Sequence, residues 1–116
     1  MFTKSSPDEL ELLAFFESSP VCLDKDAGCF LYEYSDDYGC CVQFSYNIAA
    51  GWIQYNLTSG QHENAHSYIE GVSSFSIRND KSGEYLYAES SCREFLTRIE
   101  VRIKPHVVVN SSVLIM

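Results

Sequence analysis

The sequence predicts an α+β fold in which one N-terminal helix packs on a strongly curved antiparallel sheet of about six or seven strands. Three observations support this prediction. Apolar residues recur at helical spacing near the N-terminus, alternation with a period of two begins after Pro20, and no helical segment separates the later strands. The last observation excludes a parallel sheet built from strand–helix–strand units. A chain of 116 residues is expected to form one domain over 1–116.

The first element is expected to be a helix over about residues 7–17. Ser6 can cap its N-terminus and Pro7 suits the first helical position. Glu9 follows Ser6 at the spacing of a capping box, and Ser18-Ser19-Pro20 ends the helix. Because three turns are marginally stable alone, the helix must dock by its apolar residues, which are Leu10, Leu12, Leu13, Phe15 and Phe16.

A β-meander is expected over about residues 28–110. Two alternating runs, 30–35 and 42–47, flank the turn at 36–39 and predict a β-hairpin. Alternation in the strand around 98–104 predicts one buried and one solvated face. Pro105 interrupts that strand, and residues 107–109 are expected to resume it at a sheet edge. Turn residues separate further strands near 52–57, 61–68, 72–77 and 84–90.

The acidic charge is concentrated near the N-terminus. Residues 1–40 hold nine of the sixteen carboxylates and two lysines, a formal charge of −7, whereas residues 41–116 hold seven acids and six bases. Such a surface repels anions, so it argues against nucleic acid as a partner and favours a basic one. The alternative is a solvated acidic face that only keeps the protein soluble.

Composition and cysteine content also indicate the cellular compartment in which the protein is expected. The apolar runs are too short for a membrane span, and the N-terminus lacks the apolar stretch of a signal peptide. The five cysteines, two of them adjacent, form a poor disulfide framework. We therefore expect a cytoplasmic protein with reduced thiols and no membrane partner; the oligomeric state is left open.

One motif points to metal chemistry. His62-Glu63-Asn64-Ala65-His66 matches the zinc-binding H-E-x-x-H pattern, which works on a helix because residues i and i+4 share a face. Thr58-Ser59-Gly60 and Gly71 leave little room for a helix here, so a strand with surface histidines is favoured. The clustered cysteines, Cys22, Cys29, Cys40 and Cys41, lack Cys-x-x-Cys pairs. No metal or cofactor is expected.

Catalytic arrangements are not evident. Cys92 and His106 lack the local sequence of a nucleophile pair, and the six glycines form no phosphate-binding loop. The paired aspartates at 24/26 and 36/37 fall in turns, where aspartate is common for conformational reasons. The sequence therefore predicts a binding protein and not an enzyme.

The chain resembles the small bacterial immunity proteins of contact-dependent growth inhibition and polymorphic toxin systems. The resemblance spans most of the chain and follows its core and turns. It is carried by Phe-Phe-Glu-x-x-Pro at 15–20, Phe-Leu-Tyr-Glu-Tyr at 30–34, Asp-x-x-Gly at 36–39, Val-Gln-Phe-Ser-Tyr-Asn at 42–47, Ser-Gly-Gln at 59–61 and Leu-Thr-Arg-Ile-Glu-Val-Arg-Ile-Lys-Pro at 96–105.

This resemblance implies a non-enzymatic protein that neutralises a cognate toxin C-terminal domain, often a nuclease with a basic surface. On such a protein, acidic side chains would speed the encounter with the toxin and aromatic side chains would contribute most of the affinity. The first hairpin and the segment before it carry both acidic and aromatic side chains. The expected toxin-binding residues are Asp24, Asp26, Glu33, Tyr34, Asp36, Asp37 and Tyr38. Two alternatives stay open: a metal-binding domain or enzyme using His62, Glu63 and His66, and a subunit of a larger assembly formed through an exposed sheet edge.

Overall fold

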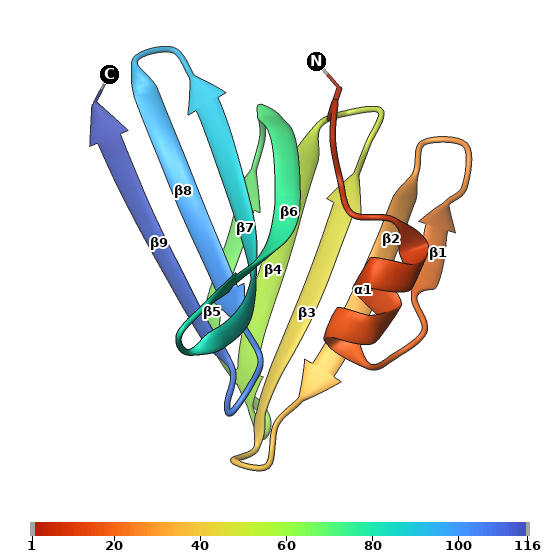
Figure 1. Cartoon of the computed structure of the whole chain (residues 1–116), viewed down its shortest axis with the longest axis vertical. Coiled ribbons are helices and arrows are strands. Elements are labelled where there is room, and N and C mark those ends of the chain that lie inside the picture. Colours follow the sequence, from red (N-terminus) through yellow and green to blue (C-terminus); the bar gives the residue numbers. More distant parts are fainter. Residues whose placement is uncertain (1, 116) are drawn as a thin grey trace.

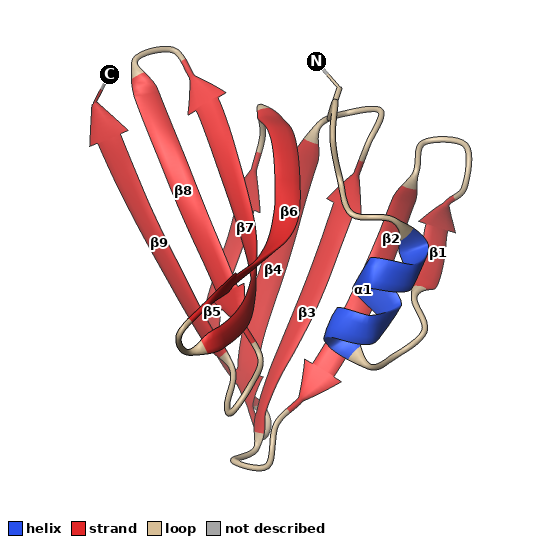
Figure 2. Cartoon of the chain, in the orientation of Figure 1, coloured by secondary structure: helices blue, strands red, loops and turns tan. Residues whose placement is uncertain are grey.

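The computed structural model describes residues 2–115 and contains one helix and nine strands in that range (Figures 1 and 2). In chain order the elements are α1 (Glu9–Phe16), β1 (Val21–Asp24), β2 (Cys29–Ser35), β3 (Cys40–Asn47), β4 (Trp52–Ser59), β5 (His62–Ile69), β6 (Val72–Asp80), β7 (Gly83–Cys92), β8 (Phe95–Arg102) and β9 (Val108–Ile115).

The strands form two antiparallel sheets, and the prediction of one meander sheet of six or seven strands is wrong in this respect. The first sheet has the order β1-β2-β3-β4-β5 and the second the order β6-β7-β8-β9. The chain passes from one sheet to the other at Glu70–Gly71, where Gly71 has a positive φ of 73°. The strand that the sequence pattern did not indicate is β1, which lies at a sheet edge and has only four residues, too few for a clear alternation.

One apolar core joins the two sheets and the helix. Figure 1 shows α1 and the second sheet on the same side of the first sheet, with α1 over β2 and the second sheet toward β4 and β5. Phe16 of α1 stacks on Tyr32 and Phe44, while Phe75 of β6 packs on Phe44 and Tyr46. A helix of eight residues covers only part of a five-stranded sheet, so the second sheet is needed to bury the rest of the sheet's apolar face.

The predicted helix is confirmed, but it is capped two residues later than expected. Asp8 is the N-cap: its carboxylate accepts the N–H of Glu11, whose side chain accepts the N–H of Asp8 in return. Ser5 is held in extended conformation beside β6, where its carbonyl accepts the N–H of Phe75 at 3.1 Å. This tertiary contact leaves Ser6 unable to begin the helix.

The predicted hairpin around residues 36–39 is confirmed, with β2 and β3 paired from Cys29↔Asn47 to Ser35↔Cys41. The edge strand expected after Pro105 is also present as β9, and it runs to Ile115.

No helix of the described residues is long and apolar enough to cross a membrane.

Candidate functional site: the outer face of the acidic sheet

The two layers of the molecule carry different charge. Residues 1–70, which include α1 and the first sheet, hold eleven carboxylates and two lysines, a formal charge of −9. Residues 71–116, which include the second sheet, hold five carboxylates and six bases, a formal charge of +1. The asymmetry seen along the sequence is therefore an asymmetry between two layers of the molecule. Four of the eleven carboxylates of the first layer belong to α1 and its two caps, on the inner side of the first sheet. We call α1 and β1–β5 the acidic layer.

The outer face of the acidic layer is the side of β1–β5 that neither α1 nor the second sheet covers. Strand register places a polar row across it, formed by Glu33, Gln43, Asn56 and His66 on four successive strands. Gln43 donates to the Glu33 carboxylate at 2.8 Å, and the His66 ring contacts the Asn56 side-chain oxygen. This row presents hydrogen-bonding groups in fixed positions, as a protein interface requires.

A second row on the same face supplies aromatic and apolar surface. Tyr68 is 48% exposed and packs against Trp52, with ring centroids 5.3 Å apart. Leu31 on β2 lies in the same row, three strands from Tyr68, and the exposed Val21 continues the row on β1. Partial burial and the neighbouring Glu70, which accepts a hydrogen bond from the phenol, raise the pKa of Tyr68.

Sequence reasoning missed this aromatic pair. The alternation of β4 carries the signal, because Trp52 shares its face with Gln54 and Asn56, not with Ile53 and Tyr55. A tryptophan on the polar side of a strand is unusual enough to mark a contact surface.

The residues expected to bind a toxin all lie on the acidic layer but at separate places. Asp24 and Asp26 lie at the β1–β2 turn, and Asp37 and Tyr38 lie at the β2–β3 turn. Seven-residue β2 separates the two turns by roughly 20 Å. Glu33 lies between them on the outer face, whereas Tyr34 faces inward and packs against the core.

Asp36 has a structural role in this region. One carboxylate oxygen accepts the N–H groups of Tyr38 and Cys40, both at 2.9 Å, and the other accepts the N–H of Val107 at 2.7 Å. These hydrogen bonds, that of Val107 first, lower the pKa of Asp36. Asp36 therefore ties the first hairpin to the segment before β9, and its charge is already engaged.

The histidine motif lies on a strand, as the flanking turns predicted. His62–Ile69 is β5, and a bulge opposite Leu57/Thr58 shifts its register. His62 pairs with Ser59 and His66 with Asn56, so the two rings lie on opposite faces, whereas residues i and i+4 of a strand without a bulge would share one face. Residues 2–115 contain no cluster of three metal-ligating side chains.

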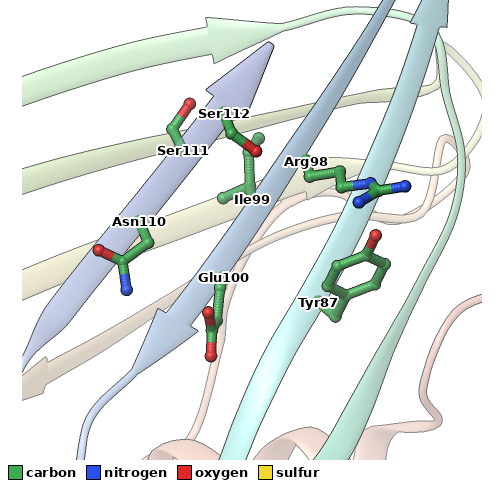
Figure 3. A pocket seen from close by; sticks show the side chains of 7 residues that line it. All are labelled: Tyr87, Arg98, Ile99, Glu100, Asn110, Ser111 and Ser112. Atoms are coloured by element: carbon green, nitrogen blue, oxygen red, sulfur yellow. The ribbon is translucent and has the colours of Figure 1, made fainter. Parts of the chain in front are cut away.

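Three hollows of the surface are lined mostly by the second sheet and its loops, and one of them also includes Phe15 of α1. Figure 3 shows one of about 180 Å³ on the outer face of the second sheet, with Arg98 beside the Tyr87 ring and Glu100 and Asn110 opposite. It is smaller than the pockets that usually hold small molecules. Arg78 lies over the Tyr87 ring at 4.0 Å and the Tyr87 phenol donates to Glu89 at 2.6 Å, so the aromatic side chain of this hollow is already held by its neighbours. This geometry stabilises a sheet surface and offers little room for a substrate.

A two-layer β-sandwich with one open acidic face that bears aromatic side chains has the construction of a small protein-binding module. No protein-family model and no curated protein matches the chain. A solved structure does: 98% of this chain aligns with all of a chain from the "Contact-dependent growth inhibition toxin - immunity protein complex from Klebsiella pneumoniae 342", with a TM-score of 0.93 and 46% sequence identity. The chain belongs to the immunity proteins of contact-dependent growth inhibition systems, and the resemblance noted in its sequence is confirmed.

Proposed function

We propose that this immunity protein acts in the cytoplasm by binding a cognate toxin domain through the outer face of its acidic layer, and that it makes and breaks no covalent bond. The observation that carries the proposal is the separation of charge between the layers, −9 against +1. Because an opposite charge speeds encounter and selects the partner, the toxin surface it meets should be cationic. A nuclease domain, which needs basic groups to hold phosphate, fits that requirement.

Within that face, Trp52 and Tyr68 are the proposed affinity anchors. Large aromatic side chains at the centre of an interface carry a disproportionate share of binding energy. Glu70 accepts a hydrogen bond from Tyr68, and Glu33 on β2 and Glu63 on β5 lie elsewhere on the same face. Asp24, Asp26, Asp37 and Tyr38 would then form the rim, where charge sets rate and specificity. Tyr34 and Asp36 support the fold and are left out of the proposed contact.

The first test is rescue of growth. A cognate toxin domain should arrest a susceptible cell when expressed alone, and co-expression of this chain should restore growth. Rescue with no detectable complex between the two purified proteins would contradict neutralisation by binding.

The second test locates the face. Tyr68→Ala should weaken toxin binding by roughly 30-fold or more, the cost of losing a central aromatic anchor. Tyr87→Ala is a matched control, because both phenols donate to a glutamate two residues further on, Glu70 and Glu89, but Tyr87 lies on the other sheet. Calorimetry or biolayer interferometry at two salt concentrations would measure both variants. Equal losses from the two variants would place the contact elsewhere.

A further inference from the structure

Three of the four sheet edges carry a feature that discourages pairing with another strand. An exposed sheet edge presents unpaired N–H and C=O groups, and proteins block such edges with short strands, bulges, charges or a covering segment. β1 is four residues long and its pairing has a bulge. β5 also has a bulge in its pairing and carries Glu63 among its exposed residues. β6 is covered by the N-terminal segment, where the Lys4 N–H bonds the Ser73 carbonyl at 2.7 Å.

β9 is built differently. Its eight residues, Val-Val-Asn-Ser-Ser-Val-Leu-Ile, include no charged residue and no proline. It pairs with β8 without a register shift from Phe95↔Ile115 to Arg102↔Val108, so it is straight and regular. Val113, Leu114 and Ile115 are exposed, Ile115 by 80%. Among residues 2–115 nothing pairs with its free side, and Figure 1 shows it at the margin of its sheet.

The polarity of β9 is symmetric about Ser111. When two copies of the strand run antiparallel with Ser111 opposite Ser111, Val109 faces Val113 and Val108 faces Leu114, while Asn110 faces Ser112. Facing residues also share a side of the sheet: Val109, Ser111 and Val113 point to the Ile99 side, and the others to the Glu100 side. Apolar residues therefore meet apolar ones and polar meet polar, as a two-fold interface requires.

The charge distribution favours a second copy over the toxin at this edge. β9 belongs to the layer with a formal charge of +1, and residues 107–115 carry no charged side chain. A cationic partner would find no electrostatic attraction at this edge, whereas two copies of the chain can meet here without like-charge repulsion. The hydroxyl and amide groups of Ser112 and Asn110, which line the hollow of Figure 3, would lie across the contact from the same groups of the second copy.

We propose that the protein forms a homodimer by antiparallel pairing of β9 with β9, centred on Ser111, which joins the two four-stranded sheets into one of eight. Every second residue of β9 directs its N–H and C=O toward the free side, and the second copy pairs them. The proposal does not depend on toxin binding, because it uses the opposite layer of the sandwich. It can be tested on the purified chain alone.

The experiment is the molar mass of the full-length protein by light scattering and sedimentation across a wide concentration range. The wild-type protein is expected at twice the chain mass. Ser111→Lys places two like charges opposite each other at the two-fold axis and should give the single-chain mass, as should Ser111→Glu. An equimolar mixture of these two variants should recover the doubled mass, because opposite charges then face each other. His62→Lys, which adds the same charge to the edge of β5, should remain dimeric.

Circular dichroism melts of each variant would establish that it is folded. A wild-type protein at the single-chain mass over the whole range would overturn the proposal. So would dimers of both single Ser111 variants, since the contact would then lie elsewhere. A mixture that stays at the single-chain mass would contradict the Ser111-centred register.

Discussion

Single side chains of this protein divide into those that hold the fold and those that are free to meet a partner. Asp36 belongs to the first group, since its two oxygens accept three backbone N–H groups from two parts of the chain. Its neighbour Asp37 is exposed in the same turn. Tyr38, 79% exposed, packs only its edge against His106, with centroids 5.9 Å apart. Adjacent aspartates thus have different roles, which their identity alone does not reveal.

We predict that Asp36→Asn lowers the free energy of unfolding, whereas Asp37→Asn leaves it nearly unchanged. The amide replaces one accepting oxygen with a donor, so at least one of the N–H groups of Tyr38, Cys40 and Val107 loses its partner. Urea unfolding at pH 7 would measure the difference. Equal stability of the two variants would contradict the structural role of Asp36.

The same carboxylate should make stability depend on pH on the acid side. Because its folded pKa is lowered, its stabilising contribution is present above the unfolded value of about 3.9 and is lost as pH falls through the lower, folded pKa. The unfolding midpoint of the wild-type protein should therefore fall more steeply than that of Asp36→Asn between about pH 5 and pH 2. Parallel curves would show that the Asp36 hydrogen bonds contribute nothing to folding.

At the scale of the element, the helix shows how tertiary contacts select a cap. Two sets of residues could begin α1: Ser6 with Glu9, and Asp8 with Glu11. The N-terminal segment decides between them because the backbone of Lys4 and Ser5 bonds to β6 and keeps the chain extended.

The helix ends at Phe16, where Glu17 takes a left-handed conformation and its carboxylate pairs with Lys104 at 2.7 Å. Leu10, expected in the apolar stripe, is 76% exposed, and the buried face is that of Leu12, Phe15 and Phe16.

We predict that Asp8→Ala destabilises the protein by about 1 kcal/mol, the usual cost of removing an N-cap side chain. Ser6→Ala should have almost no effect, because Ser6 does not cap the helix in this structure. Thermal or urea unfolding of the two variants compares the observed cap directly with the one expected from sequence. A larger loss from Ser6→Ala would mean that the helix begins two residues earlier in solution.

At the scale of the whole molecule, the two sheets share one core and should not unfold separately. Phe75 of the second sheet contacts Phe44 and Tyr46 of the first, with ring centroids 6.1 and 5.1 Å apart. The N-terminal segment adds backbone bonds to both, from Thr3 to the Ile48 carbonyl and from Lys4 to the Ser73 carbonyl. The opposite charges of the layers are thus displayed by a single cooperative unit.

We predict that Phe75→Ala destabilises the protein by about 3–5 kcal/mol, as expected for a large side chain lost from a core. Trp52, the single tryptophan, lies in the first sheet and reports its unfolding by fluorescence, while far-ultraviolet circular dichroism reports both sheets. The two signals should shift to the same lower midpoint. Phe2→Ala, which removes an exposed ring, is the control and should change little. Separate midpoints in the variant would show that the layers unfold independently.

The sequence by itself determined the elements whose signals are local. The helix, the hairpin around residues 36–39, the alternating strands and the excess of acid near the N-terminus all follow from patterns a few residues long. The immunity family also followed from its residues, and the match to a solved structure confirms it. Local chemistry sufficed because periodicity and turn residues act within one element.

Only the tertiary structure decided what depends on contacts between distant segments. The division into two sheets follows from which apolar faces can cover one another, and it turns a charge gradient along the chain into two differently charged layers. Likewise the cap at Asp8, the engagement of Asp36 by Val107 and the packing of half-buried Trp52 against Tyr68 each require a partner far away in sequence or on another strand. Alternation indicates which residues of a strand share a face only where no bulge intervenes, as the two histidines of β5 show, and packing alone decides which face stays open to a partner.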